Sequence, residues 1–181
     1  MTSDLVLVLP DTSATEALGT ALGEELARWL GADPASSVGI GLVGELGAGK
    51  TSLVRGLAQG LGVDDPGAVQ SPTYLLVVEH PGPCPLVHVD AYLPGKTRAF
   101  LADGGLDYLA ECKAVVAVEW ADKIAELMPE PTLWIELGPR PAAEGGSDPS
   151  HTSGRIARVR DPAGVFPWLQ NLRRCSPGTE P

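Results

Sequence analysis

The residues best suited to chemistry form one glycine-rich segment, residues 44–51, with the sequence GELGAGKT. It matches the phosphate-binding loop pattern G-x-x-x-x-G-K-[ST] in full. In such a loop the backbone N–H groups converge on phosphate oxygens, the lysine reaches the β- and γ-phosphates, and the threonine hydroxyl ligates Mg²⁺. We therefore expect a nucleoside triphosphate site with its metal. Its nucleotide-binding residues are predicted to be Gly44, Glu45, Leu46, Gly47, Ala48, Gly49, Lys50, Thr51 and Ser52.

Two carboxylates could complete this site. Asp90 and Glu119 each follow a short apolar segment, so each should stand at the tip of a strand. A phosphate-binding loop needs such a carboxylate to organise Mg²⁺ or the attacking water, although a strand-end carboxylate can also simply face solvent. We predict that both are catalytic. His88 lies two residues before Asp90 and on the same face of its strand, and we expect it to pack there and orient Asp90.

Two further segments are candidates for contacts with the nucleotide. Residues 71–74, with the sequence SPTY, follow the loop's helix and could fold over the γ-phosphate as a switch, but a proline-set turn is equally consistent. Three arginines at 155, 158 and 160 form the densest basic cluster. On a strand Arg155 would face away from the other two, so one face could meet a nucleotide or an acidic partner, although such clusters usually lie on a solvated edge.

The elements that must position these residues follow from hydrophobic periodicity. An apolar run at residues 38–43 precedes the loop and a helical pattern at residues 53–61 follows it, which predicts a strand–loop–helix unit. A capping box at Ser13 and Glu16 predicts the start of an earlier helix. Further strands are predicted at residues 5–9, 75–78, 86–90, 114–118, 132–137 and 155–160, and further helices at 121–127 and 165–174.

The connection between the strands at 75–78 and 86–90 decides the class of sheet. It is too short for a crossover helix, so these two strands should pair antiparallel. The fold class expected is therefore α/β, a P-loop NTPase-like three-layer fold with a mixed central sheet. We expect a single domain over residues 1–175, with a surface loop at 138–154 and a loose tail at 176–181.

Composition narrows the function further. A net charge of −10 argues against a free-standing nucleic-acid binder, because such binding rests largely on Lys and Arg. The three cysteines show no C-x-x-C pairing, and the apolar run at residues 5–9 is too short for a signal peptide or a membrane span. We therefore expect a cytoplasmic protein. The N-K-x-D sequence of common guanine-specific GTPases is absent.

The motifs as a set resemble the TsaE family, the ATPase of bacterial tRNA threonylcarbamoyladenosine (t6A) biosynthesis. Members of that family show G-[DE]-L-G-A-G-K-[ST], S-P-T-[YF], H-x-D-x-Y-R and a strand that ends in V-E-W. The matching segments here are residues 44–51, 71–74, 88–92 and 118–120, in the same order. One position departs from the pattern: Leu93 stands where the family usually has arginine.

The resemblance implies the ligands and residue roles of that family. It implies ATP or ADP with Mg²⁺, a metal held by Thr51 and Glu119, hydrolysis supported by Asp90, and approach of Thr12 and Arg155 to the nucleotide. The residues expected to act as a switch or to meet partners are Ser71, Pro72, Thr73, Tyr74 and Trp120.

The function implied is that of an ATPase subunit, slow alone, required for threonylcarbamoylation of adenosine 37 in ANN-decoding tRNAs. It would act with two partner proteins of the TsaB and TsaD type and touch tRNA only indirectly. Two alternatives remain open. One is a phosphotransferase acting on a small molecule, and the other is a nucleotide-gated interaction module with negligible turnover.

Overall fold

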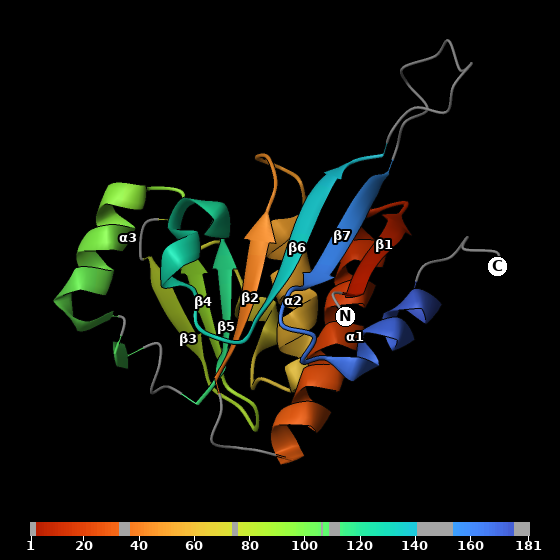
Figure 1. The fold of residues 1–181 in the computed structure, drawn as a ribbon, viewed down its shortest axis with the longest axis horizontal. Coiled ribbons are helices and arrows are strands. Elements are labelled where there is room, and N and C mark those ends of the chain that lie inside the picture. The colour runs from red at the N-terminus through yellow and green to blue at the C-terminus, as the bar shows by residue number, and fades with distance from the viewer. Residues whose placement is uncertain are drawn as a thin grey trace, which may run out of the picture.

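A computed structural model describes residues 3–32, 37–73, 76–105, 107–108, 113–140 and 154–175. Tyr74, most of the predicted loop at 138–154 and the predicted tail at 176–181 lie outside the described residues. Seven strands form one sheet in the order β1-β7-β6-β2-β5-β4-β3 (Figure 1). The strands are β1 Ser3–Leu9, β2 Val38–Val43, β3 Val77–His80, β4 Leu86–Asp90, β5 Val115–Glu119, β6 Thr132–Pro139 and β7 Arg155–Asp161.

The sheet is mixed, as predicted. Strands β4, β5, β2 and β6 pair in parallel, whereas β3 pairs antiparallel with β4 at one edge. At the other edge β7 pairs antiparallel with both β6 and β1. The carboxyl ends of the parallel strands therefore share one edge of the sheet, which is where ligands of open α/β sheets bind.

Helices cover the two faces of this sheet and complete the three layers. They are α1 Thr12–Ala32, α2 Lys50–Leu61 and α3 Pro94–Phe100, with the short helical segments η1 Pro66–Ala68, η2 Leu101–Gly105, η3 Ala121–Leu127 and η5 Pro167–Cys175. The core cluster on one face joins α1, α2 and η5 to the sheet, and a second cluster packs η3 on the other face. Figure 1 shows α3 beyond the β3 edge of the sheet.

Strand β5 shows why the central strands read as uninterrupted apolar runs. Val115 and Ala117 belong to the core cluster under α1 and α2, whereas Val116 and Val118 belong to the cluster on the opposite face. All four side chains are buried. A strand with helices on both faces needs apolar residues at every position, so period-2 alternation is lost.

Helices α1 and α2 approach each other through glycines. A Cβ built at Gly19 would overlap the carbonyl oxygen of Leu53, and one built at Gly56 would overlap that of Glu16. Gly23 and Gly60 repeat this relation one turn further along the pair. Because no side chain separates the two backbones, α1 is held directly against the helix that carries the phosphate-binding loop.

The start of α1 corrects one prediction. The helix begins at Thr12, and the side chain that caps it is Asp11, whose Oδ1 accepts the N–H of Ala14 at 2.8 Å. Ser13 therefore lies inside the helix and is not its cap. Both residues are common caps, and the carboxylate lies directly after β1, where the chain first turns.

Candidate nucleotide-binding site

The glycine-rich loop links β2 to α2 at the carboxyl edge of the sheet. Gly44 follows β2 with φ of 148°, and Gly49 caps α2 with φ of 99°. A Cβ at Gly44 would overlap the carbonyl oxygen of Leu137, and one at Gly49 would overlap the guanidinium of Arg155. Only glycine suits either position, because the backbone lies in the left-handed region and no space remains for a side chain.

Lys50 points back into this loop from the first turn of α2. Its side chain is buried, and Nζ donates to the carbonyl oxygens of Gly44 at 2.6 Å and Glu45 at 2.9 Å. Nζ also lies 3.8 Å from the centre of the Trp120 ring, a cation–π contact. Burial lowers the pKa of Lys50, and the charges of Glu119 and Asp90 partly offset that shift. The loop thus already holds a positive charge at its centre.

Glu119 and Thr51 meet beside the loop. The hydroxyl of Thr51 donates to Oε1 of Glu119 at 2.8 Å, although the two residues are 68 positions apart in the chain. Glu119 is the last residue of β5 and lies next to β2 in the sheet, where it pairs with Leu42. The predicted metal-binding pair is therefore in direct contact.

Asp90 holds the segment that contains Ser71 and Thr73. Its Oδ2 accepts the hydroxyl of Ser71 at 2.6 Å and that of Thr73 at 2.7 Å, and its Oδ1 accepts the N–H of Tyr92 at 2.8 Å. Both oxygens of this carboxylate are thus engaged. Asp90 is also the register partner of Glu119 across β4 and β5, so the segment lies beside the metal-binding pair.

The structure corrects the predicted partner of His88. This histidine is fully buried on β4, but its Nε2 lies 3.0 Å from Oε1 of Glu119, and within the described chain it makes no hydrogen bond to Asp90. The expectation rested on the spacing along one strand. The actual hydrogen bond crosses to β5, the neighbouring strand in the sheet.

A cavity of about 500 Å³ gathers most of the predicted site. It runs from Asp90 and Glu119 across the loop to Thr12 and Arg155. The predicted residues that line it are Thr12, Leu46, Gly47, Ala48, Gly49, Lys50, Thr51, Ser52, Ser71, Thr73, Asp90, Glu119, Trp120 and Arg155. Tyr92 lines it too and was not predicted, although it stands inside the H-x-D-x-Y motif. Its ring lies 5.2 Å from that of Trp120.

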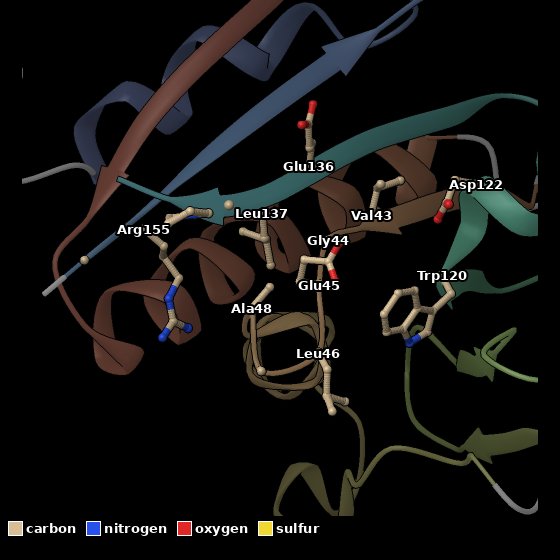
Figure 2. A pocket seen from close by; sticks show the side chains of 14 residues that line it. Val43, Gly44, Glu45, Leu46, Ala48, Trp120, Asp122, Glu136, Leu137 and Arg155 are labelled. Carbon is tan, nitrogen blue, oxygen red and sulfur yellow. The ribbon is translucent and has the colours of Figure 1, made fainter. Parts of the chain in front are cut away.

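A second cavity, of about 530 Å³, adjoins the first on the β6 side of the loop (Figure 2). The predicted loop residues Gly44 and Glu45 line this one, while Pro72 lines neither. Figure 2 shows Trp120 and Arg155 on opposite sides of the loop. The two cavities share both of these side chains, so together they form one continuous recess at the edge of the sheet.

The three arginines of β7 separate as their alternation predicts. Arg155 points toward the loop, and its Nη1 donates to the hydroxyl of Thr15 at 3.3 Å. Arg158 and Arg160 lie on the other face of the strand, where they pair with Glu136 at 3.7 and 3.9 Å. Of the three, Arg155 is the one that lines the recess.

The oxygen donors at the end of the first cavity lined by Thr51, Asp90 and Glu119, called here the phosphate end, fit Mg²⁺. Among the described residues no group of three or more His, Cys, Asp or Glu side chains could hold a metal ion by itself. Mg²⁺ needs no such cage, since it commonly binds through one or two protein oxygens, phosphate oxygens and retained water. Thr51 and Glu119 supply that kind of partial donor set.

A family model described as "Threonylcarbamoyl adenosine biosynthesis protein TsaE" matches residues 9–144, which is most of the chain. The chain belongs to the TsaE family. The resemblance inferred from the four motifs is thereby confirmed. All four motifs lie within the matched residues.

Individual relatives agree with this membership. A Streptomyces coelicolor protein named "tRNA threonylcarbamoyladenosine biosynthesis protein TsaE" is 42% identical over 120 residues, which cover 64% of this chain and 76% of the relative. A Bacillus subtilis protein of the same name is 40% identical over 97 residues, or 53% of this chain and 58% of that protein.

A solved structure supports the fold. The crystal structure of Bacillus subtilis YdiB superimposes with a TM-score of 0.66 at 24% sequence identity, and the match covers 96% of this chain and 97% of that one. None of the helices in the described ranges combines the length and the hydropathy that crossing a bilayer would require.

Proposed function

We propose that this protein is the Mg²⁺-dependent ATP-binding and ATP-hydrolysing subunit required for threonylcarbamoylation of adenosine 37 in ANN-decoding tRNAs. One observation carries the proposal: a complete phosphate-binding loop opens into the same cavity as the contacting pair Thr51 and Glu119. Membership of the TsaE family supports the pathway.

The phosphate end of the cavity supports a triphosphate ligand. The loop N–H groups and Nζ of Lys50 would hold the β- and γ-phosphates, since the ammonium already lies inside the loop on carbonyl oxygens that phosphate can replace. Thr51 and Glu119 would hold Mg²⁺, which neutralises charge on the transferred phosphate when it is bound. Burial strengthens each of these charge interactions.

The opposite end supports an adenine nucleotide. Thr12 and Arg155 line the cavity across the loop from Asp90, where the base or the ribose would lie if the loop holds the phosphates. Arg155 presents donors and a flat guanidinium that can stack on a ring. Together with the missing N-K-x-D sequence, this favours ATP over GTP.

Asp90 and the segment it holds would couple hydrolysis to partners. The hydroxyls of Ser71 and Thr73 lie at the phosphate end and are bonded to Asp90, so a γ-phosphate could draw them away or lock them in place. The partners inferred are two proteins of the TsaB and TsaD type. With a net charge of −10, this subunit would contact tRNA only through them.

The experiment that tests the proposal measures phosphate release from ATP and from GTP, with and without the two partner proteins. Slow release from ATP that rises when the partners are added is the expected result. Tight ATP binding with no release under any condition would favour a nucleotide-gated interaction module. ADP formation that needs an added small-molecule acceptor, with no free phosphate, would identify a phosphotransferase instead.

Glu119→Ala tests the metal-side carboxylate. We expect ATP to bind with most of its affinity, because the loop and Lys50 remain, while phosphate release falls by about 100-fold or more, since the Mg²⁺ site loses a ligand. Stopped-flow phosphate detection measures the rate and calorimetry the affinity. An unchanged rate would remove Glu119 from the site. Glu126→Ala, an exposed carboxylate on η3, is the matched control.

A further inference from the structure

His88 is a polar side chain in an unexpected place. It is 0% exposed, pairs in register with Ala117 of β5, and lies two register positions deeper in the sheet than the Asp90–Glu119 pair. Its only hydrogen-bonding contact in the described chain is Nε2 to Oε1 of Glu119 at 3.0 Å. Its other nitrogen, Nδ1, is buried without a partner in the same part of the chain.

The geometry settles where the imidazole proton lies. A carboxylate oxygen only accepts hydrogen bonds, so Nε2 must be the donor to Glu119. Nε2 of His88 therefore carries a proton that it donates to Glu119.

The consequence concerns the two oxygens of Glu119. Oε1 accepts from both Nε2 of His88 and the hydroxyl of Thr51. Oε2 accepts no hydrogen bond within the described chain, and Glu119 lines the cavity. One oxygen is thus anchored to the protein by two donors, and the other is left for a ligand.

We propose that His88 is a positioning residue: with Thr51 it anchors Oε1 of Glu119 and so turns Oε2 toward Mg²⁺ or a water in its shell. This inference rests on the proposed function, because it assumes that Glu119 faces a metal. Donors behind a metal-binding carboxylate fix its orientation, and their loss commonly weakens metal affinity by about 10–100-fold.

Packing alone does not explain the histidine. The nearby side chains include the apolar Leu86, Val115 and Ala117. The ring of His80 lies 6.3 Å away but makes no hydrogen bond to His88 in the described chain. Leucine would fill a similar volume without burying an unpaired nitrogen. A buried polar group with one unsatisfied nitrogen lowers stability relative to such a replacement. The hydrogen bond that His88 donates to Glu119 is the interaction that leucine could not provide.

The test compares His88→Leu with His88→Gln. Glutamine places its amide nitrogen the same number of bonds from the backbone as Nε2, so it can keep the donor, whereas leucine removes it. For the wild type and both variants, the affinity for a fluorescent ATP analogue is titrated in EDTA and in Mg²⁺, and thermal unfolding checks the fold. We expect His88→Leu to lose about tenfold or more of the Mg²⁺-dependent gain in affinity and to keep its affinity in EDTA. His88→Gln should retain most of that gain.

Each outcome separates the two proposals. If wild-type protein does not bind the ATP analogue, the proposed function fails before His88 is considered. If the wild type gains affinity with Mg²⁺ and folded His88→Leu gains equally, the positioning role is overturned while the proposed function stands. Equal losses in EDTA and in Mg²⁺ would also overturn it, because they indicate a structural defect. In the metal-free wild type, imidazole ¹⁵N spectra should show a protonated Nε2, and an unprotonated Nε2 would contradict the proposal.

Discussion

The two flanks of the phosphate-binding loop are built in opposite ways. On one flank, α1 and α2 touch backbone to backbone through Gly19 and Gly56, with no side chain between them. On the other, the segment that contains Ser71 and Thr73 is held by side-chain hydroxyls on the carboxylate of Asp90. The first contact leaves no room for a side chain between the helices, whereas the second consists of bonds that water or a phosphate could replace.

This difference would suit the two tasks of the proposed nucleotide switch, which are to hold phosphate and to sense it. Phosphate binding needs N–H groups that do not move, and close packing of α2 against α1 fixes the helix from which those groups project. Sensing the γ-phosphate needs a segment with two arrangements of similar free energy. Ser71 is exposed and Thr73 half-buried, so replacing their bonds costs little desolvation.

Lys50→Ala should produce the largest effect, on the rigid flank. Removing the ammonium takes away the charge held at the centre of the loop. We expect ATP affinity to fall by at least about 100-fold, which corresponds to about 2.8 kcal/mol, while the fold is kept. Calorimetry measures the affinity. Affinity within a few-fold of wild type would refute the loop assignment, and Arg28→Ala, on the exposed face of α1, controls for the lost charge.

Gly56→Ala tests whether that flank is as rigid as its packing indicates. The new Cβ would overlap the carbonyl of Glu16, which is backbone and cannot rotate away. We expect the free energy of unfolding to fall by about 1–3 kcal/mol or more, as in other overpacked interiors. Chemical denaturation measures it.

The matched control for that prediction is Gly31→Ala, in the last turn of the partner helix α1. No atom lies within 4 Å of a Cβ built at Gly31, so alanine meets nothing there. Alanine should therefore leave stability unchanged or raise it by about 0.5–1 kcal/mol, because it restricts the unfolded chain. Equal losses at both positions would mean that the close helix contact is not what Gly56 provides.

Thr73→Val probes the polar flank with a smaller effect. Valine keeps the shape of threonine but removes the hydroxyl that donates to Asp90. We expect amide hydrogen exchange in residues 71–80 to accelerate by about tenfold, since a hydrogen bond to a charged acceptor contributes about 1.5–3 kcal/mol. Global unfolding should change little. Thr73→Ser, which keeps the hydroxyl, should behave as wild type, and identical exchange in all three proteins would show that the bond does not hold the segment.

The sequence predicts the elements around the loop better than it predicts the contacts between distant elements. The strand, loop and helix around Lys50 are specified locally, by an apolar run, glycines and helical spacing, and each was predicted within a few residues. The antiparallel pairing of β3 with β4 followed from a connector too short for a helix. In each case the controlling residues are neighbours in the chain.

Contacts between distant elements could not be read in this way. His88 was predicted to orient Asp90 because the two residues share a strand. Its Nε2 instead lies 3.0 Å from Oε1 of Glu119 on the neighbouring strand β5. The cation–π contact of Lys50 with Trp120 and the glycine contacts of α1 with α2 depend on how closely two elements approach. Periodicity gives the face of a helix or strand but not this distance.

Leu93→Arg should have the smallest effect, at the position where this chain departs from the family pattern. The turn into α3 uses the backbone of Leu93, whose carbonyl accepts the N–H groups of Lys96 and Thr97 at 3.0 and 3.2 Å, so a new side chain leaves it intact. A cation already lies next to Leu93. Nζ of Lys123 donates to the carbonyl of Tyr92 at 3.0 Å and lies 4.6 Å from the centre of the Tyr92 ring.

If Lys123 does the work of the family arginine, Leu93→Arg alone should leave partner-stimulated ATP hydrolysis equal to wild type or up to about threefold higher. Lys123→Ala should then lower that stimulation. The double variant, Lys123→Ala with Leu93→Arg, should recover it, because either cation could contact the rings of Tyr92 and Trp120. Rates measured with both partners present decide the matter. A large loss from Leu93→Arg alone would mean that the surface around Leu93 contacts its partner through an apolar side chain. This chain would then differ from its family, which usually has arginine at this position.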